Sequence, residues 1–433
     1  MSLLKKTSHL LYNLPRTFYH DTFYGFVIAL IGSAFIFLEH FNFTSYFLNS
    51  LSALIMISGL LLSPKRVILF IGFFWGLFWV YWFGFSFQYY SLTYLIPVVS
   101  FIFAMIVLVF TIPLAYIKQI WLRALLIFLF SFTVQFDTNW IQPEYMLVYS
   151  YFGVQKWQFG IILFALALFW TLYHDNKFSN YKKFAPLPLL LLLLSGNYSA
   201  LTSEEKNLLP LKIKLYDTNI QQDRKWSSKE RLNIIQENLA AIDSAINKEY
   251  DVIVLPESAF PLYMNHYPHI QKELEKRAHN INIVTGALLQ EREDGKHAKN
   301  FNVTYIFTPD KTVIAKKTLL VPFGEYIPLP IFLQEWVNQT FFDGISDFVT
   351  AKDPTYIDIN GTQFLNAICY EALCEEMFVS HPKYMIATSN NGWFLPSTEP
   401  THQKIMMQYL SNKYGTIIYH SANRAGTGII LPQ

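Results

Sequence analysis

The chain has 433 residues, of which 52% are hydrophobic, 18% aromatic and only 15% charged. Soluble domains contain about 25% charged residues, so a single soluble domain is excluded, as is a disordered chain. The first 200 residues carry 16 charged side chains and the remaining 233 carry 48. Neither half is strongly basic, which argues against a nucleic-acid partner. Two cysteines exclude a disulfide scaffold and a Cys-rich zinc site.

The first half contains apolar stretches that approach the roughly 20 residues needed to cross a bilayer. None has an ionisable residue in its interior, which argues against an ion-coupled transporter and favours an anchor or a lipid-facing surface. We therefore predict about seven transmembrane helices, the last being the shortest: Phe23–Leu38, Phe43–Leu62, Val67–Phe87, Leu92–Tyr116, Ala124–Phe136, Trp157–Tyr173 and Phe184–Gly196.

Basic residues between these stretches predict the orientation, because Lys and Arg are retained on the cytoplasmic side. Ten of the eleven basic residues in this half precede the first stretch or lie in every second loop, and only Lys156 lies in the others. The N-terminus is therefore expected inside. With seven spans, the second half is expected outside, so the short stretch Phe184–Gly196 decides its side.

The second half alternates strand-like and helix-like patterns. "LKIKLYDTNI", "YDVIVLPES", "INIVTGALL", "FLNAICYE" and "KYMIATSNN" are typical of strands, and "SSKERLNIIQENLAAIDSAIN" has apolar residues at helical spacing. Such alternation favours layered α/β packing. We predict a membrane domain over residues 1–200 and an extracytoplasmic α/β domain over residues 208–433.

Three residues at strand ends are candidates for chemistry. Glu257 follows a buried strand and is a potential base, although a solvated loop glutamate is the simpler interpretation. Cys369 ends another strand, where a cysteine is more often inert, and as a nucleophile it needs a nearby base or cation. Lys317 is either an ordinary surface lysine or a stabiliser of a developing oxyanion.

The segments around these residues resemble known motifs. "VLPESAFP", "KKTLLVPFGEYIP" and "NAICYE", in that order, resemble the three motif regions of the nitrilase, or carbon–nitrogen hydrolase, superfamily. "LLVPFGEYIP" after a set of membrane spans is similar to the apolipoprotein N-acyltransferase family within it, as are "NIQQDRKW" and "SNNGWF". The resemblance implies an α-β-β-α sandwich with a Glu–Lys–Cys triad. That family usually has a further span after the sandwich, and no apolar run follows "SANRAGTGIILP" here.

The resemblance also implies roles for individual residues. Glu257 would be the general base, Lys317 the stabiliser of the tetrahedral intermediate, and Cys369 the nucleophile that carries an acyl thioester. Glu325 would support the lysine. Tyr370 and Glu371, directly after the nucleophile, match positions needed for activity.

Two tryptophans, the second cysteine and one long loop are further candidates, and each also has a purely structural interpretation. Trp226 and Trp393 match tryptophans at the mouth of the family's site, where they would bind substrate, but they are equally typical of interfacial anchors. Cys374 is expected to be a packing residue, because its spacing from Cys369 does not suit a disulfide. The stretch Phe332–Lys352 is a candidate gate, or a packed surface loop.

The implied reaction needs no cofactor and no metal. A phospholipid would donate the acyl chain, and the α-amino group of a diacylglyceryl-cysteine apolipoprotein would accept it, in ping-pong order. The setting would be the bacterial inner membrane, with the catalytic domain on the periplasmic side. A membrane-tethered amidase that transfers the acyl group to water is the first alternative, and a non-enzymatic membrane scaffold is the second.

Overall fold

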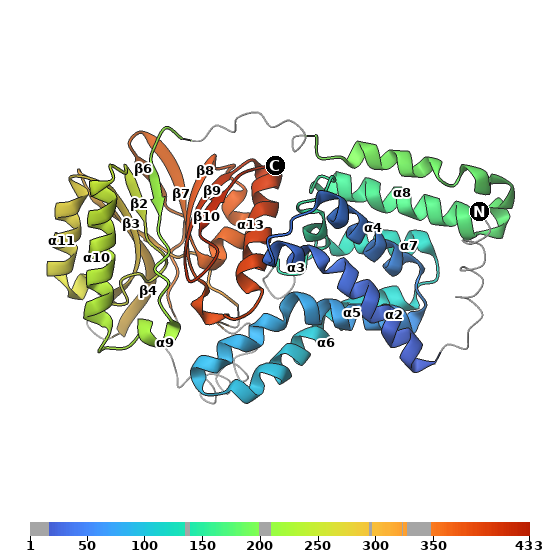
Figure 1. Cartoon of the computed structure of the whole chain (residues 1–433), viewed down its shortest axis with the longest axis horizontal. Coiled ribbons are helices and arrows are strands. Elements are labelled where there is room, and N and C mark those ends of the chain that lie inside the picture. The colour runs from blue at the N-terminus through green and yellow to red at the C-terminus, as the bar shows by residue number, and fades with distance from the viewer. Residues whose placement is uncertain (1–16, 135–138, 199–208, 294–296, 323, 327–347) are drawn as a thin grey trace.

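The computed structural model describes residues 17–134, 139–198, 209–293, 297–322, 324–326 and 348–433. A helical part formed by the first half lies beside an α/β part formed by the second half (Figure 1). This arrangement confirms the predicted fold class.

The helical part contains a helical segment at each of the seven predicted positions. Among the described residues, three helices are long and apolar enough to cross a membrane, and the pair α2 and α3, bent by 50°, would make a fourth. Helices α4 and α7 are shorter, so the number of spans stays a prediction. The segments are α2 (Phe18–Gly32), α3 (Ala34–His40), α4 (Tyr46–Leu62), α5 (Lys65–Val80), η1 (Tyr81–Tyr90), η2 (Thr93–Leu95), α6 (Ile96–Tyr116), α7 (Ile120–Phe130), η3 (Pro143–Leu147), α8 (Lys156–His174), η4 (Asn176–Phe184) and η5 (Leu187–Ser195).

Small residues allow α5 and α6 to pack closely. A Cβ at Gly72 would lie 2.0 Å from Thr111 Oγ1, and one at Gly76 would lie 2.8 Å from the Cα of Ala104. Close backbone approach at small residues is the usual way in which apolar helices associate in lipid. Many side chains on the outside of this part are large, apolar and exposed, including Phe101, Val109 and Leu125.

In its described residues, the α/β part contains two five-stranded sheets. The first has the order β1-β2-β3-β4-β5 and the second β10-β9-β8-β7-β6. The interior strands β2 and β8 are buried along their whole length, as expected for parallel strands covered on both faces. The strands are β1 (Ile213–Leu215), β2 (Val252–Val254), β3 (Asn282–Glu293), β4 (His297–Phe307), β5 (Thr312–Lys316), β6 (Tyr356–Ile359), β7 (Thr362–Ile368), β8 (Tyr384–Asn390), β9 (Ile417–Asn423) and β10 (Gly428–Ile430).

The layers follow the order helix, sheet, sheet, helix. Helices α10 (Arg231–Asn247) and α11 (Pro268–Ala278) cover the first sheet, and α13 (Glu399–Tyr414) covers the second (Figure 1). Val254 and Ile306 from one sheet pack against Phe364 from the other in an apolar layer between them. The shorter segments of this part are α9 (Gln222–Lys225), η7 (Met264–His266), η8 (Cys369–Leu373), η9 (Glu375–Phe378) and η10 (Asn391–Trp393).

Helix α13 also joins the two parts of the molecule. One continuous apolar cluster extends from Met56 and Trp79 in the membrane helices, through Met406 on α13, to Leu365 and Met385 in the second sheet. In Figure 1, α13 lies between that sheet and the membrane helices. The second sheet, whose strand β7 leads directly to Cys369, is therefore positioned on the membrane side of the sandwich.

Candidate active site

Cys369 lies at the end of β7, where the chain turns sharply. Its φ is +54°, a left-handed conformation that costs a non-glycine residue free energy, and it is the first residue of η8. The turn leaves the cysteine partly exposed between buried neighbours. A strained turn after a buried strand is a common way of presenting a reactive side chain.

Glu257 lies three residues after β2, in the first sheet. Its Oε1 accepts a hydrogen bond of 2.7 Å from Asn302 Nδ2, and the side chain is only 8% exposed. Strand β3 passes so close that a Cβ at Gly286 would lie 2.3 Å from the backbone nitrogen of Ser258. Glycine at position 286 therefore permits the turn that carries Glu257.

Lys317 directly follows β5 and is 1% exposed. Its Nζ lies 2.8 Å from Glu325 Oε1 and 2.7 Å from Oε2, so the ammonium is held by both carboxylate oxygens. Glu325 Oε2 also accepts a hydrogen bond of 2.9 Å from the backbone N–H of Val321. Asn302 Nδ2 also approaches Glu325 Oε1 at 3.4 Å. One asparagine amide thus connects the carboxylates of Glu257 and Glu325.

The electrostatics of the three residues are coupled. Burial alone would lower the pKa of Lys317, but the carboxylates of Glu325 and Glu257 outweigh it and raise that pKa. Burial and the charge of Glu257 raise the pKa of the Cys369 thiol well above its ordinary value, although Lys317 opposes them. The lysine is therefore charged and the resting thiol is protonated, so attack by sulfur requires a base to remove its proton.

Lys225 is a further buried cation that the sequence analysis did not single out. It is 1% exposed, and its Nζ donates a hydrogen bond of 2.8 Å to the backbone oxygen of Glu257. Burial lowers the pKa of Lys225 to about 8, while the nearby Glu257 and Cys369 act in the opposite direction. The only sequence feature that could have pointed to Lys225 is its place in the motif "NIQQDRKW", next to Trp226.

Glu371 forms hydrogen bonds that link the turn at Cys369, called the cysteine turn below, to the segment after Lys317. Its Oε1 accepts hydrogen bonds from the backbone N–H of Thr318 at 2.6 Å and of Leu319 at 3.2 Å, and also from the Thr318 hydroxyl. Its Oε2 accepts one of 2.7 Å from the N–H of Ile368. These bonds occupy both oxygens, so the contacts of Glu371 are those of a positioning residue.

The residues that flank the cysteine turn are packed. Tyr370 is buried, and its backbone oxygen accepts a hydrogen bond of 3.3 Å from Cys374 Sγ. Cys374 is 4% exposed and is not in a disulfide, in line with the predicted packing role.

The two predicted tryptophans lie on different segments. Trp226 follows α9 and is 41% exposed, and Trp393 is on η10, with its ring 5.6 Å from that of Tyr89 in η1. Three motif segments meet here: Asn423 Nδ2 donates to the backbone oxygen of Ile220 at 2.9 Å and to Asn390 Oδ1 at 2.8 Å.

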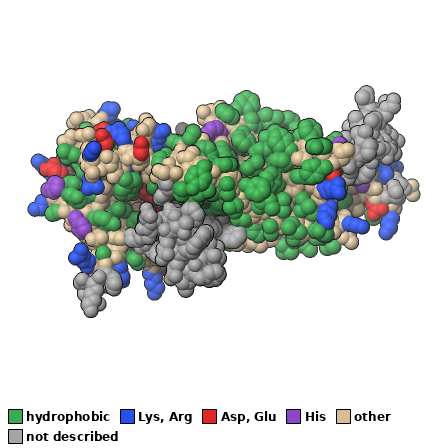
Figure 2. All heavy atoms as spheres, turned by 90° about the horizontal axis from the view of Figure 1, so that it is seen from below, with side chains coloured by type: hydrophobic (Ala, Val, Ile, Leu, Met, Phe, Trp, Pro, Cys, Tyr) green, Lys and Arg blue, Asp and Glu red, His purple; other side chains and the backbone are tan. Residues whose placement is uncertain are grey.

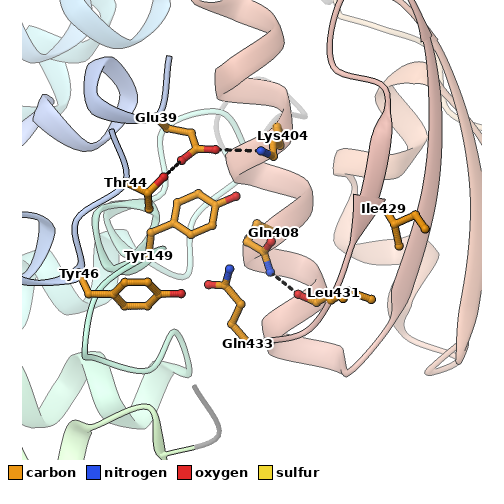
Figure 3. A pocket seen from close by; sticks show the side chains of 9 residues that line it. All are labelled: Glu39, Thr44, Tyr46, Tyr149, Lys404, Gln408, Ile429, Leu431 and Gln433. Atoms are coloured by element: carbon orange, nitrogen blue, oxygen red, sulfur yellow. Dashed lines mark hydrogen bonds and ion pairs between the residues drawn. The ribbon is translucent and has the colours of Figure 1, made fainter. Parts of the chain in front are cut away.

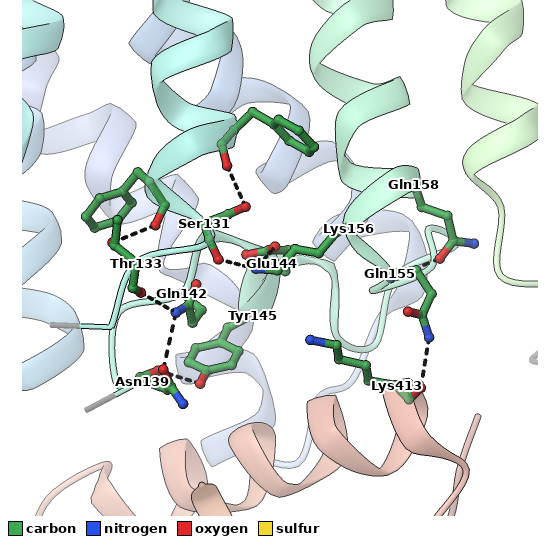
Figure 4. A network of polar contacts seen from close by, with 12 residues as sticks. Ser131, Thr133, Asn139, Gln142, Glu144, Tyr145, Gln155, Lys156, Gln158 and Lys413 are labelled. Atoms are coloured by element: carbon green, nitrogen blue, oxygen red, sulfur yellow. Dashed lines mark hydrogen bonds and ion pairs between the residues drawn. The ribbon is translucent and has the colours of Figure 1, made fainter. Parts of the chain in front are cut away.

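The membrane part contacts the cysteine turn directly. The ring of Trp140 lies 5.9 Å from that of Tyr370, and the ring of Tyr145 lies 6.2 Å from that of His402 on α13. The loop that carries both aromatic residues is held by a partly buried ion pair, in which Lys156 Nζ lies 2.6 Å from the Oε1 of the buried Glu144 (Figure 4).

A pocket of about 390 Å³ lies at the junction of the two parts. Glu39 and Lys404 form an ion pair of 2.8 Å across it, and the rings of Tyr46 and Tyr149 line the membrane side (Figure 3). None of the predicted catalytic residues lines this pocket, so it is separate from the candidate active site.

Comparison with known protein families shows to which family the chain belongs. Residues 19–195 match the family described as "Apolipoprotein N-acyltransferase integral membrane domain", and residues 219–426 match "Carbon-nitrogen hydrolase". The chain belongs to the apolipoprotein N-acyltransferase family. Proteins named apolipoprotein N-acyltransferase from Wolinella succinogenes and Helicobacter hepaticus are each 39% identical to it, covering 93% and 89% of this chain and 94% of each relative. One from Campylobacter jejuni is 32% identical, covering 94% of this chain and 89% of the relative.

Membership in the apolipoprotein N-acyltransferase family confirms the resemblance drawn from the motifs and makes the chain a bacterial membrane protein with a hydrolase-type domain. It does not favour the amidase alternative. The roles predicted for single residues stay predictions, as do the boundaries at residues 200 and 208. Most of the proposed gate, residues 332–347, lies outside the described part of the chain.

Proposed function

We propose that this chain transfers an acyl chain from a phospholipid to the N-terminal α-amino group of a diacylglyceryl-cysteine apolipoprotein, through a thioester on Cys369. The observation that carries the proposal is the position of Cys369. It lies at a strained turn supported by Glu371, within the electrostatic reach of Glu257 and Lys317, and next to a residue that packs on Trp140 of the membrane part.

In the first half-reaction, Glu257 takes the proton of the Cys369 thiol as sulfur attacks the ester carbonyl carbon. The ammonium of Lys317, held by Glu325, stabilises the negative charge that develops on the carbonyl oxygen. When the intermediate collapses, the proton on Glu257 passes to the departing alkoxide of the lysophospholipid. The acyl chain then remains on sulfur, and the carboxylate of Glu257 is again a base.

In the second half-reaction, the amine of the acceptor attacks the thioester and the thiol is restored. Transfer to an amine rather than to water requires a site poor in water and open to lipid. The apolar contacts between α13, the cysteine turn and the membrane helices support such a setting.

The arrangement of charges supports a periplasmic catalytic domain. Lys65 begins α5 and lies 3.6 Å from the ring centroid of Tyr116, the last residue of α6. At its other end, α5 continues into η1, where Tyr89 donates a hydrogen bond of 2.8 Å to the backbone oxygen of Gly392 in the α/β part. An apolar belt separates charged side chains at the two ends of the molecule (Figure 2). Basic residues are retained inside, so the α/β part would face outward.

Intact-protein mass spectrometry tests the first half-reaction. After incubation with a phospholipid of defined chains, the protein is expected to gain the mass of one acyl group, removable by hydroxylamine. Cys369→Ala is expected to gain none, whereas Cys374→Ala, a matched control with the buried second cysteine, is expected to be acylated. An acyl mass on Cys369→Ala would contradict the proposal.

A further inference from the structure

The first turn of α13 carries buried polar atoms that no described residue satisfies. Thr398 and Glu399 are each 5% exposed and His402 is fully buried, yet Thr398 Oγ1, Glu399 Oε2 and His402 Nε2 have no hydrogen-bond partner among the described residues. Buried polar side-chain atoms nearly always have a partner. Three such atoms within five residues indicate a place that receives a polar group of a ligand.

This turn lies between the candidate nucleophile and the membrane part. Helix α13 packs against η8, which begins at Cys369, and against α3 and η3 of the membrane part. The N–H of Thr398 donates to Tyr81 Oη at 3.1 Å, and Trp82 Nε1 donates to His402 Nδ1 at 3.4 Å. A negative charge on Glu399 would also raise the pKa of the Cys369 thiol, so the carboxyl lies within electrostatic reach of the reacting sulfur.

The chemistry of the turn favours a cationic ligand group. Burial alone raises the pKa of Glu399 to about 8, and no described charge contributes to that shift. The titratable groups on the elements packed against α13, with Tyr81 of η1, are Tyr81, Glu39, His40, Glu144, Tyr145, Cys369, Tyr370, Glu371, Glu375, Glu376, Tyr419 and His420. The cations of α13 itself, Lys404 and Lys413, form ion pairs with Glu39 and Glu375, and Glu399 is in no ion pair among the described residues. Burial lowers the pKa of His402, on the same helix, to about 4, so it is uncharged near neutrality. A buried carboxyl that lacks a cation is stabilised in its charged form when an ammonium binds beside it.

The proton balance of the second half-reaction requires an acceptor besides Glu257. An α-amino group has a pKa of about 8, so it arrives mostly as an ammonium at neutral pH. As the N–C bond forms and the C–S bond breaks, the nitrogen loses two protons and keeps one. Glu257 takes one of them and returns it to the departing sulfur, which regenerates the thiol. The other proton must leave through a second base.

We propose that Glu399 is this second base: it releases its own proton to solvent as the α-ammonium of the acceptor binds beside it, and the resulting carboxylate takes the first proton from that ammonium. In a buried site the uncharged pair of carboxylic acid and amine is favoured over the ion pair. Transfer thus leaves a neutral amine beside the thioester and returns Glu399 to its protonated resting state. This inference rests on the proposed function, of which it describes the acceptor step.

The test separates the two half-reactions. The acyl-enzyme is formed with phospholipid, its thioester is verified by mass, and it is then mixed with a synthetic diacylglyceryl-cysteine peptide between pH 6 and pH 9.5. Glu399→Gln is expected to form the thioester but to transfer the chain at least about 30-fold more slowly at pH 7. The deficit is expected to shrink to about 3-fold or less at pH 9.5, where the amine arrives neutral.

Two further variants complete the test. Glu399→Asp retains a carboxyl and is expected to recover part of the transfer rate, which also keeps the proposal testable if Glu399→Gln does not fold. Glu376→Gln, a change at an exposed glutamate of η9, serves as the matched control. A deficit of Glu399→Gln that is equal at every pH, or absent, would overturn the role of Glu399 alone. A wild type that forms no thioester would instead overturn the proposed function.

Discussion

Asn302 organises the charged residues of the candidate site although it carries no charge. Its side-chain amide donates a hydrogen bond of 2.7 Å to Glu257 Oε1, and the amide nitrogen lies 3.4 Å from Glu325 Oε1. Its backbone oxygen accepts a hydrogen bond of 3.0 Å from the N–H of Lys317. The residue therefore fixes the distance between the proposed base and the carboxylate that holds the lysine.

Removing the Asn302 amide is expected to slow acylation. In Asn302→Leu, the two carboxylates lose their common donor, and we expect thioester formation to fall about 10²-fold, the magnitude typical of one positioned donor. The rate is measured from the acyl mass as a function of time. Asn265→Leu removes an asparagine amide bonded to Gln290, away from the site, and is the control. A wild-type rate in Asn302→Leu would exclude this positioning role.

Glu399 gives a prediction for the pH dependence of stability. Its pKa rises from 4.5 in the unfolded chain to about 8 in the folded protein, so the folded state binds the extra proton between these values. The stability associated with this proton is complete below pH 4.5 and is lost as pH rises toward 8, with a limit on the order of 5 kcal/mol. Thermal unfolding in detergent between pH 5 and 8.5 is expected to show a smaller decline for Glu399→Gln than for the wild type. Equal declines would contradict the burial of an unpaired carboxyl.

At the scale of elements, Glu371 connects the two sheets of the sandwich. It lies on η8 after β7 of the second sheet, and its Oε1 binds the segment after β5 of the first sheet. Lys317 and Cys369 directly follow those two strands, so this one carboxylate fixes how the lysine and the cysteine face each other.

Glu371→Gln is expected to weaken both the fold and the reaction. A glutamine has only one acceptor oxygen, so one group of buried N–H donors loses its partner at a cost of about 1–3 kcal/mol. We expect a lower unfolding midpoint in detergent and slower thioester formation. The neighbouring exposed Glu376→Gln is expected to change neither. A loss of acylation with an unchanged midpoint would instead indicate direct contact with the substrate.

Sequence reasoning located the strands because those signals are local, and the resemblance of three short motifs supplied the proposed triad. The buried run before Glu257 and the turn after "NAIC" are visible in a few residues. Lys225 and Asn302 were missed, because their importance depends on contacts formed between separate strands and segments. The unpaired state of Glu399 also depends on packing by the membrane part, so it could not be read from "STEPTH".

At the scale of the whole molecule, the turns at one end of the membrane part are held together by Arg123. Its Nη1 donates to the backbone oxygens of Leu61 at 2.8 Å and Ser63 at 2.9 Å, and its Nε donates to that of Ile117 at 2.7 Å. The turns between α4 and α5 and between α6 and α7 thus lie together, at the end of α5 opposite to η1. This end carries the basic residues expected to be cytoplasmic.

Cysteine labelling in whole cells tests that orientation. In a Cys369→Ser, Cys374→Ser background, Lys248→Cys on the α/β part is expected to react with an impermeant maleimide from outside. Lys183→Cys, in η4, is expected to react only after lysis. Both side chains are exposed, so accessibility alone does not distinguish them. Labelling of the position-183 cysteine in intact cells would overturn the seven-span count and the orientation.

The fate of the acyl group on Cys369 tests the central claim most directly. Acyl-enzyme made from a phospholipid with an isotope-labelled chain is separated from free lipid and mixed with a diacylglyceryl-cysteine peptide or with its N-acetylated form. We expect the labelled chain to appear as an amide on the free-amine peptide, with loss of the thioester, and to stay on the enzyme with the acetylated peptide. Release of the labelled chain as free fatty acid at the same rate in both mixtures, with no amide formed, would contradict the account.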